Sequence, residues 1–243
     1  MPYEVPYHKY RPLVISGPSG VGKGTLIKRL LDAHPDMFST VISHTTRDPR
    51  QGEDDSSYTF VSKREFQKLY REGVFIEATV FGNHYYGTSM QAVSQVLCRD
   101  AIPLLDLDIK GVKAMKKIKR LDAKYVFIKP LSFTALESRL RSRGTESEAN
   151  IQRRMTKAKL DQKYAEKKGA YNLIIINDNL ETAYAELKEF ALSDSMASPT
   201  KVKCKDALLV CRSLFYSVLC SVCWQSSAQS PIHVHFHSML CRY

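Results

Sequence analysis

The chain has 243 residues, 44% of them hydrophobic and 25% charged, which is ordinary for a soluble globular protein with one substantial core. Its formal net charge of +11 suits either nucleic acid or small polyanionic substrates. No basic run with interleaved aromatic residues is present, so nucleic acid is not an expected partner.

The amino terminus, residues 1–6, lacks a charged segment followed by an apolar one, so we expect no secretory signal and a cytoplasmic location. Of the six cysteines only Cys98 precedes residue 200. The body of the chain therefore has no disulfide framework, as expected of an intracellular protein.

Apolar runs at 13–16, 102–107, 125–129 and 173–176 alternate with helical patterns between about residues 12 and 192. Strands that alternate with helices predict an α/β fold with a mainly parallel sheet covered on both faces.

Residues 17–25 form a glycine-rich loop between the first apolar run and a helical pattern at 26–31. Glycines let successive N–H groups converge on a phosphate, the helix adds its positive end, and Lys23 can reach the terminal phosphates. Gly24 stands where a hydroxyl is usual, so Thr25 is the candidate magnesium ligand. The predicted nucleotide-binding loop comprises Gly17, Pro18, Ser19, Gly20, Val21, Gly22, Lys23, Gly24 and Thr25.

An aromatic insert spans about residues 40–90, with strand-like runs at 58–61 and 75–77 and a hairpin-like Gly82-Asn83. The sequence from Ser62 to Glu65 is a capping-box pattern that predicts a helix start.

Two arginines of the insert, Arg47 and Arg50, are three residues apart and can clamp one phosphate by bidentate hydrogen bonds. The alternative is a pair of solvated loop arginines. Tyr58 and Tyr86 add phenolic donors in the same insert.

The insert also carries polar groups for a base: Ser43, Glu53, Glu77 and Thr88. Guanine presents N1–H and its 2-amino group side by side, and one carboxylate accepts from both; adenine has no such pair. Glu77 is the candidate, unless it is an ordinary outward-facing carboxylate.

Asp106 and Asp108 alternate at the carboxyl end of the 102–107 run, where open α/β sheets place ligands. Their carboxylates can hold magnesium or contact the acceptor nucleotide. Alternatively, they can form structural ion pairs.

A second insert, about 132–168, is helical in pattern and rich in arginine and lysine. Arg139 and Arg143 share a helix face, and Arg154 follows a bend at Gly144. If this segment closes as a lid, the three guanidinium groups neutralise a transferring phosphoryl group and exclude water; otherwise they are a solvated charged face.

Residues 195–243 carry five cysteines and one acidic residue and do not continue the α/β pattern. We expect a poorly structured extension. Two alternatives stay open, a membrane-associating segment at 207–224 and a metal site that combines Cys220 and Cys223 with the histidines after them.

In this order the motifs closely resemble those of guanylate kinases over about residues 10–192. The most specific is the block Thr45-Thr46-Arg47-Asp48-Pro49-Arg50-Gln51-Gly52-Glu53. Further matches are Phe75-Ile76-Glu77, Tyr85-Tyr86-Gly87-Thr88, Leu105-Asp106-Leu107-Asp108, Arg143-Gly144-Thr145-Glu146 and Ile176-Asn177-Asp178.

The resemblance implies a domain over residues 1–194 with core, GMP-binding insert and lid, and the reaction ATP + GMP to ADP + GDP with Mg²⁺, in a monomer. It implies guanine contacts from Ser43, Glu77, Thr88 and Asp108, with Glu53 and Gly87 also near GMP. It also implies that the phosphate of GMP is bound by Arg47, Arg50, Tyr58 and Tyr86. The transferred phosphoryl group is expected to be stabilised by Lys23, Arg139, Arg143 and Arg154. The residues expected beside adenine are Asn177 and Asp178.

Three departures from the family pattern stand out: a loop before Tyr58 that is one residue shorter, Lys110 where glutamine is common, and the 195–243 extension. Two other functions compete. A non-catalytic scaffold domain typically degrades the phosphate loop, which is intact here. An adenylate kinase is suggested by Gly-Lys-Gly-Thr, but Ser43 and Glu77 favour guanine.

Overall fold

A computed structural model describes residues 9–50, 54, 57–81, 83–142, 144 and 147–193. Its core is a five-stranded sheet in the order β2-β7-β1-β8-β9, with every pairing parallel. The strands are β1 (Leu13–Ser16), β2 (Phe38–Thr40), β7 (Ile102–Asp106), β8 (Lys124–Lys129) and β9 (Leu173–Ile176). The predicted parallel sheet is confirmed, and β2 is an additional strand that the sequence analysis did not predict.

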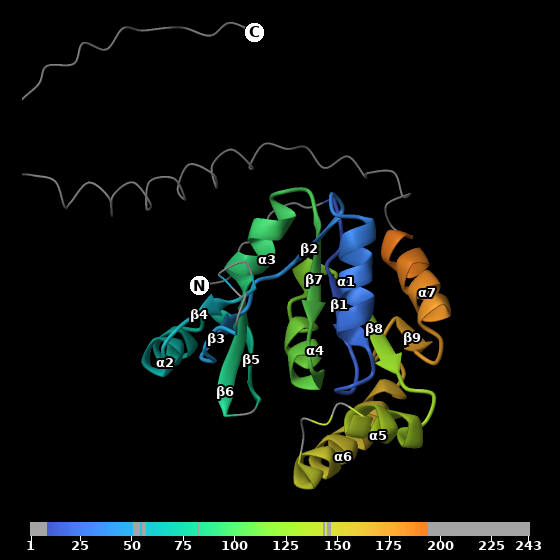
Figure 1. Ribbon diagram of the computed structural model, residues 1–243. Coiled ribbons are helices and arrows are strands. Elements are labelled where there is room, and N and C mark those ends of the chain that lie inside the picture. Colours follow the sequence, from blue (N-terminus) through green and yellow to red (C-terminus); the bar gives the residue numbers. More distant parts are fainter. Residues whose placement is uncertain are drawn as a thin grey trace, which may run out of the picture. The chain divides into compact units, whose positions relative to one another are not determined.

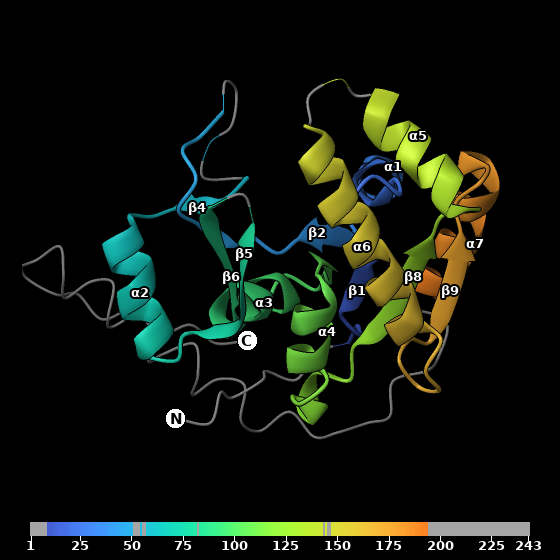
Figure 2. The ribbon, with the colours of Figure 1, turned by 90° about the horizontal axis from the view of Figure 1, so that it is seen from below.

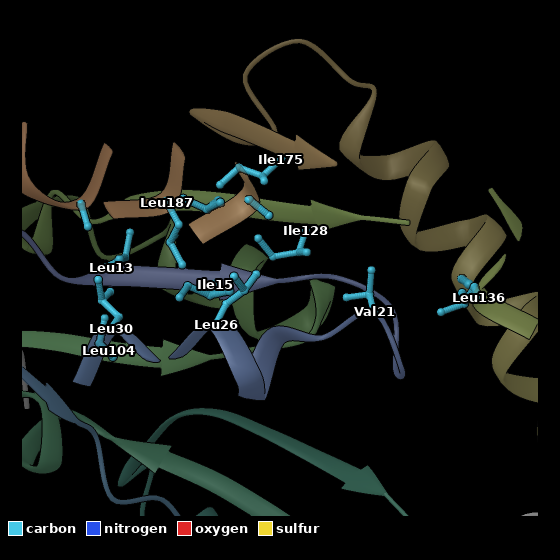
Figure 3. Packing of buried hydrophobic residues seen from close by; sticks show 14 of the residues in the cluster. Leu13, Ile15, Val21, Leu26, Leu30, Leu104, Ile128, Leu136, Ile175 and Leu187 are labelled. Atoms are coloured by element: carbon cyan, nitrogen blue, oxygen red, sulfur yellow. The ribbon is translucent and has the colours of Figure 1, made fainter. Parts of the chain in front are cut away.

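Helices cover both faces of this sheet because its strands are apolar on both sides. Leu13 and Ile15 of β1 belong to one core cluster, shown in Figure 3, whereas Val14 belongs to the other. The first cluster is completed by helices α1 (Lys23–Ala33) and α7 (Leu180–Leu192), the second by α3 (Met90–Leu97) and α4 (Ile109–Met115). A short 3₁₀ helix, Lys119–Leu121, precedes β8.

The predicted aromatic insert folds into a second, four-stranded sheet in the order β4-β3-β6-β5 (Figure 1). Its elements are β3 (His44–Thr45), β4 (Thr59–Phe60), α2 (Lys63–Arg71), β5 (Phe75–Phe81) and β6 (His84–Ser89). Strands β5 and β6 form the antiparallel hairpin expected at Gly82-Asn83, with Asn83 left-handed at φ 68°.

Helix α2 begins where the capping box predicts, because the Ser62 hydroxyl accepts a hydrogen bond from the Glu65 amide at 3.1 Å. Phe66 of this helix stacks on Phe75 and Tyr85, with ring centroids 4.6 and 5.4 Å away. These contacts fix α2 to the back of the β5–β6 hairpin.

The arginine-rich insert forms two helices, α5 (Phe133–Ser142) and α6 (Glu148–Ala165), and the predicted bend between them includes Gly144 at φ 64°. Arg141 of α5 joins the two helices through Glu148 of α6 at 2.5 Å, and it also pairs with Glu137 of its own helix at 2.7 Å. In Figure 2 the small sheet with α2 lies to the left of the core, whereas α6 crosses in front of the core and α5 lies to its right.

Some expectations fall on residues that the structure does not describe. They are Glu53, Arg143 and the extension 195–243 with its three alternatives. Among the described residues, no helix combines the length and apolar character that a membrane crossing needs.

Candidate active site

The loop after β1 depends on its glycines. Gly17, Gly20 and Gly22 have φ of 147°, 89° and 99°, a region that side chains rarely adopt. A Cβ on Gly17 would lie 2.3 Å from the Ile128 carbonyl oxygen, and one on Gly22 would lie 2.4 Å from the Asn177 side-chain nitrogen. The loop is thus packed against β8 and the residue after β9, and a side chain at either glycine would push it away from them.

Lys23 is the first residue of α1, and its side chain folds back into the loop. Its Nζ donates to the carbonyl oxygens of Gly17 at 2.8 Å and Pro18 at 3.2 Å. The same ammonium lies 3.8 Å from Oδ1 of Asp106, and the Lys23 side chain is 14% exposed. The predicted cation is therefore inside the loop, where phosphate oxygens can replace the two carbonyls.

Asp106 ends β7, as the sequence predicted for a ligand-facing acid. Burial raises the pKa of its carboxyl and the Lys23 ammonium counters that rise, although 49% of the side-chain surface meets solvent. Thr25 is exposed in the first turn of α1.

These two oxygen donors suit Mg²⁺, which commonly takes one or two protein ligands and completes its shell with phosphates and water. Within the described part of the chain, no three His, Cys, Asp or Glu side chains gather into a metal cluster.

Asn177, expected beside adenine, is buried against the phosphate loop. Its Nδ2 donates to the Val21 carbonyl oxygen at 2.7 Å, while its backbone carbonyl accepts from Arg139 Nη1 at 3.1 Å. The neighbouring Asp178 is exposed. One side chain therefore supports the loop directly, and the other is accessible to a ligand.

The arginines of α5 and α6 converge on this loop. Arg154 Nη1 donates to the Ser19 hydroxyl, and Arg139 reaches the loop through Asn177. The structure thus brings together two of the three predicted lid cations, since Arg143 is outside the described residues.

The small sheet holds the predicted base-binding groups in one hydrogen-bonded chain. The hydroxyl of Thr88 donates to Glu77 Oε1 at 2.7 Å and lies 2.9 Å from the Ser43 hydroxyl. Glu77 is 9% exposed, and burial raises the pKa of its carboxyl to about 7, against the opposing hydrogen bond from Thr88. Glu77 is thus an inward-facing acid, and the outward-facing alternative is wrong.

Asp108 caps α4 and faces this chain from the core. Its Oδ1 accepts from the Gly111 amide at 3.0 Å, and its Oδ2 accepts from Lys157 Nζ at 3.2 Å. Thr79 on β5 lies 3.5 Å from the same Oδ2. Burial opposes ionisation, but the Gly111 amide and the Lys157 ammonium hold the pKa of Asp108 below its usual value.

Three of the residues predicted to bind the phosphate, Arg47, Tyr58 and Tyr86, lie close together. The Arg47 guanidinium lies 5.5 Å from the Tyr58 ring and donates to the Asp48 carbonyl at 2.8 Å, and the Tyr58 and Tyr86 rings meet at 6.0 Å. Arg50 is exposed nearby in sequence, and Glu53 is not described.

Gly87, expected near the substrate, has a packing role in the sheet. A Cβ there would lie 2.9 Å from the Phe75 ring and 3.0 Å from Phe66, on the face that α2 covers. The neighbouring Thr88 points to the other face because side chains alternate along a strand.

Sequence analysis did not predict Lys157, Asp161 or Thr79. Arg154, Lys157 and Asp161 are three and four residues apart on α6, so they share one face of the helix. Asp161 is 7% exposed, and burial raises the pKa of its carboxyl. The helical spacing from Arg154 is the one signal that could have indicated the other two residues of α6.

Comparison with known proteins gives a family match over the α/β part of the chain. The family model described as "Guanylate kinase" matches residues 9–194. The guanylate kinase of Schizosaccharomyces pombe is 46% identical over 187 residues, which cover 76% of this chain and 92% of that protein. The human guanylate kinase is 44% identical over 189 residues, covering 76% and 94%.

A solved structure, that of guanylate kinase from Anaplasma phagocytophilum, superposes with a TM-score of 0.58 at 24% identity. It covers 79% of this chain and 89% of its own, and it supports the fold.

Proposed function

The chain belongs to the guanylate kinase family and is an ATP:GMP phosphotransferase, and we propose that the side chains described above carry the transfer. The observation that supports this most directly is the buried acid of the small sheet. Glu77, Thr88 and Ser43 form a continuous hydrogen-bonded chain. Such an arrangement presents a carboxylate to the adjacent N1–H and 2-amino donors of guanine.

The acceptor end is assigned to the small sheet together with the start of α4. Glu77, Thr88, Ser43 and Asp108 read the base, while Arg47 and Tyr58, beside Tyr86, bind the phosphate. Arg50 and Glu53 extend this set from the sequence resemblance. Guanidinium groups suit a monophosphate because they donate two parallel hydrogen bonds.

The donor end is assigned to the glycine loop, with residues 17–25 around the phosphates of ATP. When ATP binds, the Lys23 ammonium exchanges its hydrogen bonds to the carbonyls of Gly17 and Pro18 for hydrogen bonds to phosphate oxygens. Arg154 and Arg139 contribute positive charge from α6 and α5, with Arg143 as the third member. Phosphoryl transfer requires this positioning and charge neutralisation rather than covalent catalysis.

Magnesium, when bound, neutralises charge on the phosphates. We assign its protein contacts to Asp106 and Thr25, which are oxygen donors of the kind it prefers. Adenine is assigned to the neighbourhood of Asp178, with Asn177 acting through the loop.

We further propose, from the resemblance to guanylate kinases, that the monomer is the active form. The scaffold alternative is disfavoured by an intact loop with Lys23 inside it. Steady-state assays with ATP, Mg²⁺ and either GMP or AMP test the assignment, and strong turnover of GMP over AMP is expected.

A further inference from the structure

Lys157 of α6 makes an ion pair with the residue that caps α4, and the proposed reaction has not used this pair. Its Nζ lies 3.2 Å from Oδ2 of Asp108, the acid assigned to guanine. The two residues are on different elements and 49 positions apart in the chain. The lysine side chain is 55% exposed, whereas that of Asp108 is 21% exposed.

We propose that Lys157 is a positioning residue for GMP, which orients the Asp108 carboxylate and so connects helix α6 to the base-binding site. The proposal rests on the guanylate kinase function and on the assignment of Asp108 to the base. Lys157 itself is not placed in contact with the substrate.

The geometry of Asp108 supports an orienting role. One oxygen is held by the Gly111 amide at the start of α4, and the other is held by Lys157. With both oxygens engaged, the plane of the carboxylate is set before a ligand arrives. A carboxylate has about four lone-pair directions, so acceptor capacity remains for a base N–H. Preorganisation of this kind improves binding because less side-chain freedom is lost.

The charges around the site also call for a cation here. Glu77 is buried on one side of Asp108, and Asp161 is buried on α6. Burial is the main reason that the pKa of each carboxyl is raised, and repulsion from Asp108 adds to it. Lys157 offsets this cluster of negative charge while leaving Glu77 to the base.

Lys157 shares one face of α6 with Arg154, so the helix contacts two parts of the site. Arg154, one turn earlier on the same face of α6, donates to Ser19 in the phosphate loop. A single helix therefore contacts the donor site through Arg154 and the acceptor site through Lys157. Movement of α6 as a lid would change both contacts together.

An ordinary surface ion pair is the competing explanation, and such pairs contribute about 0–1 kcal/mol. It differs from our proposal in what it predicts for substrate binding. A pair that only adds stability changes melting temperature and leaves the Michaelis constants alone.

The test compares three variants of the full chain: Lys157→Ala, Lys157→Arg and Lys159→Ala. Lys159 is an exposed lysine on the same helix, so its variant removes the same charge away from Asp108. We expect Lys157→Ala to raise KM for GMP about tenfold, the size expected for loss of one charged hydrogen bond. We expect kcat within about twofold of wild type and KM for ATP unchanged, since a positioning role acts on one substrate.

Lys157→Arg should restore KM for GMP to within about twofold, and Lys159→Ala should match wild type. Calorimetric titration with GMP alone should show the same tenfold loss of affinity for Lys157→Ala, and no such loss for Lys157→Arg or Lys159→Ala, without dependence on ATP.

An unchanged or lowered KM for GMP in Lys157→Ala would overturn the proposal, as would an equal rise in KM for ATP or the same effect from Lys159→Ala. If wild type itself fails to turn over GMP, the proposed function fails instead. The two failures are therefore distinguishable.

Discussion

The side-chain amide of Asn177 donates to the backbone carbonyl of Val21 at 2.7 Å, tying the end of β9 to the middle of the phosphate loop. The two residues are 156 positions apart, and both are buried. Gly22 leaves room for the amide, since a Cβ there would lie 2.4 Å from it. The loop's shape therefore depends on a residue that does not belong to it.

Asn177→Ala should destabilise the protein by about 1–3 kcal/mol, because a buried carbonyl loses its donor. It should also raise KM for ATP more than KM for GMP, since the donor loop loosens. Urea unfolding and steady-state kinetics measure the two effects.

Asn179→Ala is the matched control, because Asn179 caps α7 through the amides of Glu181 and Thr182. Loss of such a cap costs about 1 kcal/mol and should leave KM for ATP unchanged. Equal effects of both variants on KM for ATP would contradict a loop-supporting role for Asn177.

Lys23→Met should lower kcat by a factor of about 10² or more, since removal of one transition-state donor costs roughly that much. Methionine keeps the apolar stem of the side chain, so the fold should survive, and circular dichroism and melting temperature check this. A folded variant with kcat within tenfold of wild type would refute the role of Lys23.

Glu77→Gln should change how stability depends on pH. The folded-state pKa of Glu77 is raised from 4.5 to about 7, so the folded protein holds this proton more tightly than the unfolded chain does. The stability contribution is therefore present at low pH and is lost as pH rises toward 7. Wild type should lose roughly 2–3 kcal/mol relative to Glu77→Gln between pH 5 and pH 8.

Urea unfolding of both proteins at several pH values measures this difference. A pH-independent difference would show that Glu77 is ionised throughout. Binding of GMP should also release a proton near pH 6.5, because guanine donors favour the carboxylate, and the heat of binding in buffers of different ionisation enthalpy detects that proton.

Phe66→Ala should cost about 3–5 kcal/mol, the usual range for a buried phenylalanine. Phe66 is 2% exposed and stacks on Phe75 and Tyr85, so removal of its ring destabilises the small sheet in particular. KM for GMP should rise while KM for ATP holds. Tyr70→Ala on the same helix is the control, because Tyr70 is 63% exposed and its loss should stay within about 0.5 kcal/mol.

The strands of the core sheet that the sequence predicted are those with continuous apolar runs. Strand β2, Phe38–Thr40, went unpredicted because it is short, lies at the sheet edge and carries two hydroxyl residues. Its partner β7 supplies the pairing that makes it a strand. That pairing is a tertiary effect, absent from local sequence.

The site was predicted in its residue types more fully than in its contacts. The carboxylate of Glu77 was expected, but its burial follows from the β5–β6 register that pairs it with Thr88. A bulge between Phe75 and Glu77 shifts that register. The Lys157–Asp108 pair joins distant segments, and no local pattern indicates which lysine of α6 reaches the acid.

The most direct test of the central claim, that the buried Glu77 chain selects guanine, is the ratio of kcat/KM for GMP and AMP in wild type and Glu77→Gln, with ATP and Mg²⁺ saturating. We predict that wild type strongly prefers GMP and that Glu77→Gln loses about 10² or more of that preference, since a site built around hydrogen bonds discriminates through them. The loss should come from GMP turnover. An unchanged preference in a folded Glu77→Gln variant would contradict the assignment of the base to this site.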